Sequence, residues 1–159
     1  MKRQIMLILL LILSLPALPA CGASAAAPEP EAQTEEVTEM TMHLKIGDTA
    51  VETAWENNAS VEALKALCAD EPLVVEMSMY GGFEQVGSIG KRLPRSDVQI
   101  TTKAGDLVLY SGNQLVVFYG SNAWAYTRLG HITDRSAKEM AELLGSGDVT
   151  ITISPGPDK

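Results

Sequence analysis

The sequence predicts a mainly β fold: a small closed antiparallel barrel of about eight strands, with two short helices over its ends. Between Ala104 and Ile132, short apolar runs are separated by Gly, Asn and Ser, which is typical of consecutive antiparallel strands. The middle run, Leu115–Tyr119, is apolar at both alternating positions, so we expect both of its faces to be covered. The βαβ spacing of a parallel sheet is missing, and an open sandwich is the alternative.

The expected strands follow one another through residues 40–153. The first, 40–46, alternates Met, Leu and Ile with polar residues, as a half-buried strand does. The segment 83–97 contains two Gly, one Pro and mixed polarity, so we expect a long excursion there with at most one short strand. The other expected strands are 49–55, 73–79, 98–102, 107–110, 115–119, 126–132 and 149–153.

Two segments carry helix signals. Asn57, Asn58 and Ser60 are N-cap candidates for a helix with Val61, Leu64, Leu67 and Cys68 on one face, and Pro72 prevents its continuation. The second helix begins with the capping box Ser136-Ala-Lys-Glu139 and ends at Gly145.

The first twenty residues have the form of a secretory signal, with a basic start, the apolar run 5–13 and small residues. Leu-Pro-Ala-Cys at positions 18–21 resembles a bacterial lipobox, in which the cut falls before a Cys that carries a diacylglycerol. We therefore expect lipidation of Cys21, which would anchor the protein in the cell membrane at its extracytoplasmic face. An ordinary signal peptide cut elsewhere is the alternative.

The signal is followed by a tether, a domain and a tail. Residues 21–39 comprise the expected lipidated Cys and an Ala, Pro and Glu segment without aromatic or basic residues, which we expect to be disordered and extended. Residues 40–154 suffice for one small core, and 155–159 form a Pro-Gly-Pro tail. The excess of 20 acidic over 12 basic residues argues against a nucleic-acid partner.

No cofactor or metal site is expected. His43 and His131 lie far apart and lack the Cys or carboxylate spacing of metal ligands. The glycines at 81–82 and 87–90 lack phosphate-loop spacing. We interpret Asp106, which follows Gly105, as a residue that stabilises a turn. We interpret Cys68 as a buried inert thiol.

Several short motifs keep a characteristic order across residues 40–153. They are Asn57-Asn58, Ala104-Gly105-Asp106 with Tyr110, Leu115–Tyr119, Leu129-Gly130-His131-Ile132 and the ending Gly145–Ile153. In this order they resemble the small bacterial cyclophilin-like proteins. The resemblance implies the cyclophilin barrel of eight antiparallel strands capped by two helices.

True cyclophilins are prolyl isomerases, and the resemblance to them is partial. Trp124 has a place similar to their pocket Trp, but their Phe-His-Arg and Gln-Gly-Gly-Asp segments have no counterpart. The missing Arg matters because X–Pro rotation has a barrier of roughly 18–20 kcal/mol, which a guanidinium donating to the amide lowers. The arginines that follow the expected signal sequence, Arg92, Arg95, Arg128 and Arg135, lie outside that context, so we assign no catalytic residue.

The candidate binding residues are Trp124, Tyr126, Arg128 and Phe118. Tyr126 and Arg128 alternate on one face of their strand, where they form either an aromatic-plus-cation binding spot or a solvent-facing pair. Trp124 follows Ser121-Asn122 and is expected either to be exposed for binding or to fold back on the core.

The favoured hypothesis is a membrane-anchored, extracytoplasmic cyclophilin-like module that binds a peptide or small ligand without catalysis. The alternative is a weak prolyl isomerase or chaperone, which needs an Arg, an apolar floor and a polar amide partner in one cleft. A third hypothesis, an accessory partner of a redox protein, rests only on relatives that occur beside flavodoxin-type proteins.

Overall fold

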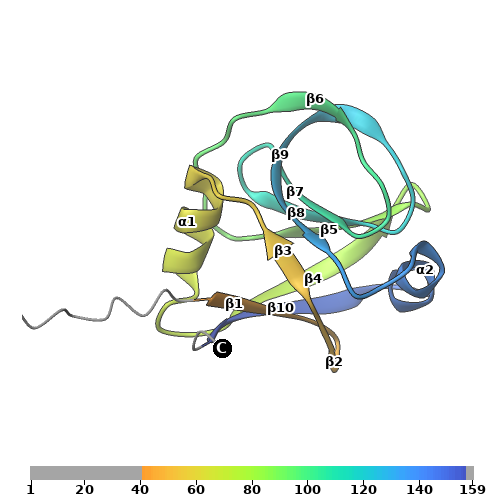
Figure 1. Cartoon of the computed structure of the whole chain (residues 1–159), viewed down its shortest axis with the longest axis horizontal. Helices are drawn as coiled ribbons and strands as arrows, with labels where there is room; N and C mark the ends of the chain where they lie inside the picture. Colours follow the sequence, from red (N-terminus) through yellow and green to blue (C-terminus); the bar gives the residue numbers. More distant parts are fainter. Residues whose placement is uncertain (1–40, 157–159) are drawn as a thin grey trace, which may run out of the picture. The chain divides into compact units, whose positions relative to one another are not determined.

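The computed structural model describes residues 41–156, drawn in colour in Figure 1. The expected signal sequence, Cys21 and the acidic tether lie outside the described residues. The elements are β1 (Thr41–Ile46), β2 (Thr49–Val51), β3 (Thr53–Trp55), α1 (Ala59–Leu67), β4 (Leu73–Tyr80), β5 (Glu84–Ser88), β6 (Val98–Thr101), β7 (Asp106–Tyr110), β8 (Gln114–Phe118), β9 (Ala123–Ile132), α2 (Ala137–Leu144) and β10 (Val149–Gly156).

The strands form a nearly closed antiparallel barrel. Their order is β2-β1-β10-β4-β5-β8-β7-β9-β3, and β6 pairs with the first half of β9. In Figure 1, β6 to β9 curve around the upper part while β1 and β10 cross below them. The predicted fold class is confirmed. The strand expected to end at Ile153 continues to Gly156, because β1 pairs with residues 151–156 of this strand.

The prediction of one continuous strand over 49–55 is wrong, because this segment is divided at Glu52 into two strands. Its first half, β2, pairs with β1, and its second half, β3, pairs with β9 at the other end of the series. The Glu52 carbonyl accepts a hydrogen bond from the Thr133 N–H at 2.8 Å. The indole N–H of Trp55 donates to the Met42 carbonyl at 3.0 Å. This segment therefore joins the two ends of the sheet and closes the barrel.

Strand β8 separates two hydrophobic clusters. Leu115 and Val117 face the barrel core, which also contains Leu107, Leu129 and side chains of both helices. Val116 and Phe118 face outward, in a smaller group that we call the outer cluster. The outer cluster consists of Val108, Val116, Phe118 and Tyr126, with Phe83, Val86 and Ile100 packed against it. The expectation that both faces of this run are covered is confirmed.

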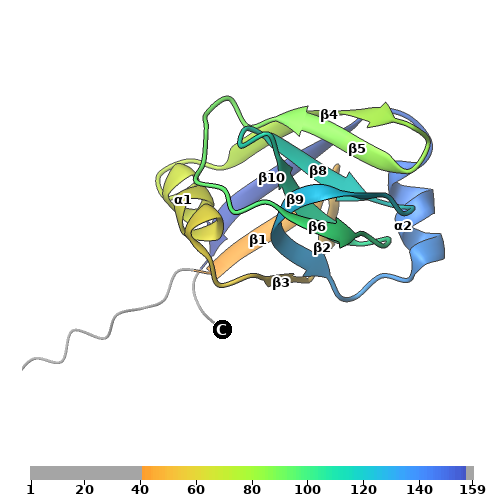
Figure 2. The ribbon, with the colours of Figure 1, turned by 90° about the horizontal axis from the view of Figure 1, so that it is seen from above.

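The helices lie at opposite ends of the barrel, as Figure 2 shows. At α1 the cap is Asn58, whose side-chain oxygen accepts from the N–H groups of Ser60 and Val61, each at 3.0 Å. At α2 the predicted capping box of Ser136 and Glu139 is present. In the described part of the chain, neither helix is long and apolar enough to cross a membrane.

The Cys68 thiol is buried, as expected. Burial raises its pKa, and Sγ donates to the Leu64 carbonyl at 2.9 Å. Both observations agree with an inert packing role.

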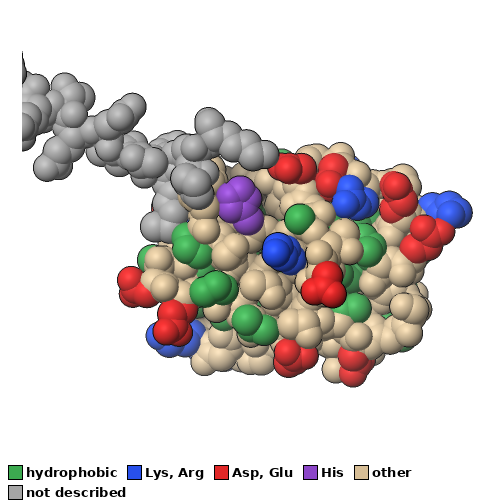
Figure 3. Space-filling view, turned by 90° about the horizontal axis from the view of Figure 1, so that it is seen from below, with side chains coloured by type: hydrophobic (Ala, Val, Ile, Leu, Met, Phe, Trp, Pro, Cys, Tyr) green, Lys and Arg blue, Asp and Glu red, His purple; other side chains and the backbone are tan. Residues whose placement is uncertain are grey.

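The face formed by β1, β2 and β10 carries acidic and basic side chains interspersed with scattered hydrophobic ones (Figure 3). Within residues 41–156, the large hydrophobic side chains that are exposed come from other strands. They are Val74, Met79, Tyr80, Val98, Tyr110 and Trp124. Apart from Val74, which pairs with Thr152 of β10, the apolar surface that a ligand could cover is therefore found away from β1 and β10.

Candidate functional site

A groove of about 410 Å³ opens over the outer cluster. Strands β4, β5, β7, β8 and β9 and the segment before β9 contribute to its wall. The lining residues are Tyr80, Glu84, Val86, Tyr110, Gln114, Val116, Asn122, Trp124 and Tyr126. Its volume lies within the range of small-molecule sites, roughly 300–1,000 Å³.

Aromatic rings dominate this groove. Tyr126 is buried and packs edge-to-face against Phe118 beneath it, with ring centres 5.7 Å apart, and against Tyr110 at 6.0 Å. Tyr80 and Trp124 stand at the opening, with 67% and 56% of their surface exposed. Buried rings thus form a fixed floor, and exposed rings offer apolar area to a ligand.

A hairpin turn places a carboxyl group in the groove. Gly81 and Gly82 both have positive φ, +63° and +75°, which glycine adopts without strain. The turn brings Tyr80 directly opposite Glu84 across β4 and β5, so both side chains project to the same face. On the other face of β5, a Cβ at Gly87 would lie 2.5 Å from the Met77 sulfur, so β5 packs closely on the core there.

Glu84 is only 6% exposed, although a carboxylate is costly to bury. Its Oε2 is buried and accepts no hydrogen bond within residues 41–156. Burial raises the pKa of Glu84 to about 7. The Tyr126 hydroxyl accepts a hydrogen bond from the Asn122 amide at 2.9 Å. The pKa of the Tyr126 hydroxyl is raised first by burial and next by the charge of Glu84, so the two groups interact electrostatically.

The comparisons with known proteins agree with this architecture. The family model described as the cyclophilin-like family matches residues 44–154, more than half of the chain. The chain belongs to the cyclophilin-like family. No curated protein and no solved structure matched it.

Of the four residues predicted to bind, the cyclophilin-like groove brings two together. Trp124 and Tyr126 line it, and Phe118 lies fully buried under Tyr126. Arg128 lies apart, in a second pocket of about 290 Å³ at the start of α1. Of the two alternatives for Tyr126 and Arg128, the shared aromatic-plus-cation binding spot is therefore not formed.

Strand β9 contains a bulge just after Arg128. Leu107 pairs with Gly130 but the next residue, Val108, pairs with Arg128, so β9 has one extra residue there. Such a bulge redirects side chains. The Arg128 guanidinium lies 3.6 Å from the carboxylate of buried Asp106.

Asp106 has the turn role that the sequence predicted. Its Oδ2 accepts from the Lys103 N–H at 2.9 Å, and its Oδ1 lies 2.9 Å from His131 Nδ1. The carboxylate thus joins its own turn to His131 and Arg128 on β9, and this cluster lies outside the groove lining.

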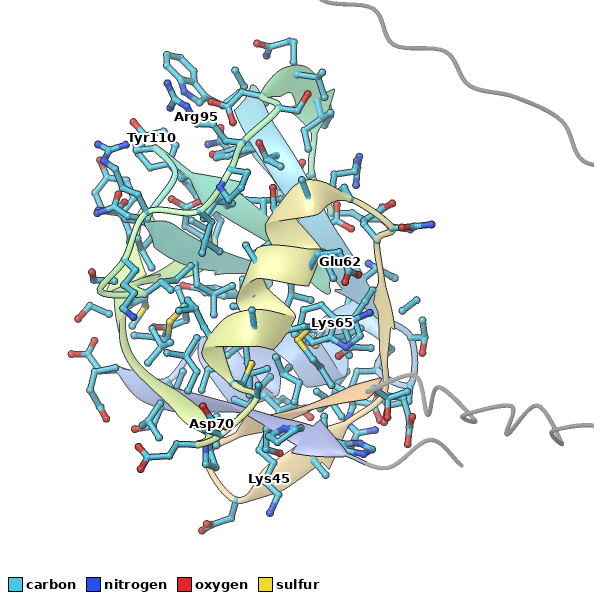
Figure 4. The ribbon with its side chains drawn as sticks, turned by 90° about the vertical axis from the view of Figure 1, so that its left-hand side faces the viewer. Lys45, Glu62, Lys65, Asp70, Arg95 and Tyr110 are labelled. Atoms are coloured by element: carbon cyan, nitrogen blue, oxygen red, sulfur yellow. The ribbon has the colours of Figure 1, made fainter. Side chains whose placement is uncertain are left out.

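None of the four arginines belongs to the groove lining. Arg95 and Tyr110 project near each other in the view of Figure 4, but the Arg95 guanidinium pairs with Asp97 at 3.3 Å and Arg95 lines the second pocket. Arg92 donates to the Ser111 carbonyl at 3.0 Å, and Arg135 pairs with Asp134. The cleft therefore lacks the guanidinium that the isomerase hypothesis requires.

Sequence reasoning missed several lining residues, Glu84 above all. A single Glu at the start of an irregular segment is ordinarily solvated. A signal was nevertheless present: Tyr80-Gly81-Gly82 is a hairpin turn, and a hairpin sets the residues flanking it side by side. The other lining residues that were not predicted to bind are Tyr80, Val86, Tyr110, Gln114, Val116 and Asn122.

Proposed function

We propose that this protein is a membrane-anchored, extracytoplasmic cyclophilin-like module that binds a peptide or small ligand without catalysing prolyl isomerisation. The groove with exposed Tyr80 and Trp124 over a buried aromatic floor carries the proposal. The described lining of the groove contains no Arg. Ligand binding does not need a guanidinium, whereas catalysis of prolyl isomerisation does, so we favour binding.

The exposed rings provide a favourable contribution to binding. An aromatic side chain can bury roughly 150–250 Å², and apolar burial contributes roughly 25 cal/mol per Å². Covering the exposed parts of Tyr80 and Trp124 would thus contribute about 5 kcal/mol before the cost of association. The fixed floor under Tyr126 reduces that cost, because it needs no reordering.

Ligand binding can be tested on residues 40–159, which include every described strand, both helices and both hydrophobic clusters. A library of neutral and charged fragments and short peptides would be screened by backbone amide chemical shifts. We expect the shifts to concentrate at Tyr80, Glu84, Trp124 and Tyr126. Shifts only around Arg128, or none in a folded sample, would overturn the groove as the binding site.

Catalysis can be tested on the same domain with a proline tetrapeptide, beside the Arg128→Ala variant. We expect isomerisation at the uncatalysed rate for both proteins. A clear acceleration that falls in Arg128→Ala would establish an isomerase with its site at the second pocket instead.

The anchor is tested on the full chain in bacterial cells. We expect a radiolabelled fatty acid to be incorporated into the protein and the protein to stay in the membrane fraction. Both should be lost in Cys21→Ala. An unlabelled, soluble exported protein would favour the ordinary signal peptide.

A further inference from the structure

We propose that the groove recognises an organic cation, an ammonium group that pairs with the Glu84 carboxylate among the rings of Tyr80, Trp124 and Tyr126. This assignment of ligand class rests on the proposed binding function. It is carried by a carboxyl group that the fold buries in the groove without a partner.

A buried carboxylate is stable only when a cation or several donors face it. In the described part of the chain, no Lys, Arg or His lines this groove. Of the two lining amides, Asn122 donates to the Tyr126 hydroxyl, and within residues 41–156 neither Asn122 nor Gln114 donates to the buried Oε2 of Glu84. Arg95 lines the second pocket and is paired with Asp97. A ligand is therefore left to supply the positive charge.

The aromatic lining favours the same kind of ligand. The faces of Trp and Tyr rings attract cations within about 6 Å, most strongly where water is excluded. Trp124 and Tyr80 are exposed at the opening, and Tyr126 lies on the floor. An anion would meet both the negative ring faces and Glu84. The chain's formal net charge of −8 also favours encounter with cations.

A second kind of ligand is a neutral carbonyl compound, which would accept a hydrogen bond from the protonated carboxyl group of Glu84. The two chemistries differ in the sign of their pH dependence. An ammonium ligand needs ionised Glu84, so its affinity rises with pH and levels off once Glu84 is ionised. A carbonyl ligand loses affinity over the same range. The titratable groups that line the groove with Glu84 are the hydroxyls of Tyr80, Tyr110 and Tyr126, and burial raises the pKa of Tyr126.

The test uses residues 40–159 and three probes, followed by amide shifts between pH 6 and pH 8.5. The probes are n-butylammonium, N-acetyl-lysine-amide and the neutral N-acetyl-norleucine-amide. Glu84→Gln removes the charge and keeps the shape, and Glu76→Gln is a matched control on exposed β4 surface. Thermal unfolding of each variant checks its fold.

We expect both cations to bind at pH 8 at least tenfold more tightly to the wild type and to Glu76→Gln than to Glu84→Gln. Their affinity should rise from pH 6 to pH 8 in the wild type and stay flat in Glu84→Gln. Tighter binding of the lysine probe would indicate a lysine side chain of a peptide, and tighter binding of butylammonium a free amine.

Three results would overturn the cation assignment: equal binding of the norleucine probe, cation affinity that rises toward low pH, or full cation binding by Glu84→Gln. Failure of all three probes to bind would overturn it too. Binding of the neutral probe in the groove would still support the binding module, so the two proposals fail separately.

Discussion

Glu84 shows how one side chain can serve binding at the expense of stability. Its neighbours across the groove are aromatic or amide groups, and none of the contacts found within residues 41–156 neutralises its Oε2. Residues that destabilise the folded state are common at functional sites, where they serve function instead. The cost of burying Glu84 should therefore be measurable in the free protein.

Stability should depend on pH through Glu84. Its pKa is about 7 in the folded protein against 4.5 ordinarily, so the folded state holds the extra proton between these values. The contribution of Glu84 to stability is therefore fully present below pH 4.5 and is lost as the pH rises through 7, by at most about 3 kcal/mol. Chemical unfolding of wild type and Glu84→Gln should give equal stability near pH 5 and a more stable variant at pH 8.

Glu76→Gln serves as the control here as well, because Glu76 is exposed on β4. Its unfolding free energy should follow that of the wild type at every pH. Parallel curves for wild type and Glu84→Gln would mean that Glu84 is ionised and solvated in the folded protein.

Among the elements, α1 links the barrel end to the second pocket. Asn58 caps the helix, and its amide also donates to the Arg128 carbonyl on β9 at 2.9 Å. The Ser60 hydroxyl donates to the Pro94 carbonyl at 2.7 Å, which holds the segment after β5 against the helix. One cap residue thus fixes both the start of α1 and its position on the sheet.

Replacing this cap should destabilise the domain. Asn58→Ala removes two accepted hydrogen bonds at the helix start and one donated to β9, so we expect a loss of about 1–2 kcal/mol. Asn57→Ala is the matched control, because Asn57 is exposed and precedes the cap. Urea unfolding of both variants measures the difference. Equal stability of the two would show that another residue caps α1.

For the whole molecule, closure depends on the segment that crosses from β2 to β3. The described sheet ends at β2 and β3, and the Trp55 indole spans from β3 to the Met42 carbonyl on β1. A partly buried hydrogen bond of this kind contributes about 0.5–1.5 kcal/mol.

Trp55→Phe should weaken this closure while keeping an aromatic ring. We expect a loss of about 1–2 kcal/mol, including the packing lost with the smaller ring. Hydrogen exchange should accelerate at residues 41–43 and 53–55 more than in β7 and β8. Uniform acceleration over the sheet would instead show that the barrel opens only by complete unfolding.

Much of the fold could be predicted because local signals agreed with the tertiary structure. The apolar run of β8 indicated two covered faces, and Ser136 with Glu139 marked the start of α2. The split at Glu52 could not be predicted, since β2 pairs with the neighbouring β1 while β3 pairs with β9, which is distant in sequence. Among the groove residues, Trp124 and Tyr126 could be predicted because they are aromatic residues of one strand. The bulge in β9 just after Arg128 has no clear sequence signal, because Gly130 and Arg128 fit an unbroken strand equally well.

The two-sided strand β8 has a consequence for how this family can diversify. Val116 faces the groove while Leu115 and Val117 support the barrel core, so neighbouring residues on one backbone serve recognition and folding. A larger or smaller side chain at Val116 would move the backbone of β8, which is also packed against the barrel core through Leu115 and Val117. New ligand preferences should therefore arise more readily at Tyr80 and Trp124, whose exposed rings can be exchanged without disturbing the barrel. The rim of the groove is thus the part most open to evolutionary or engineered change.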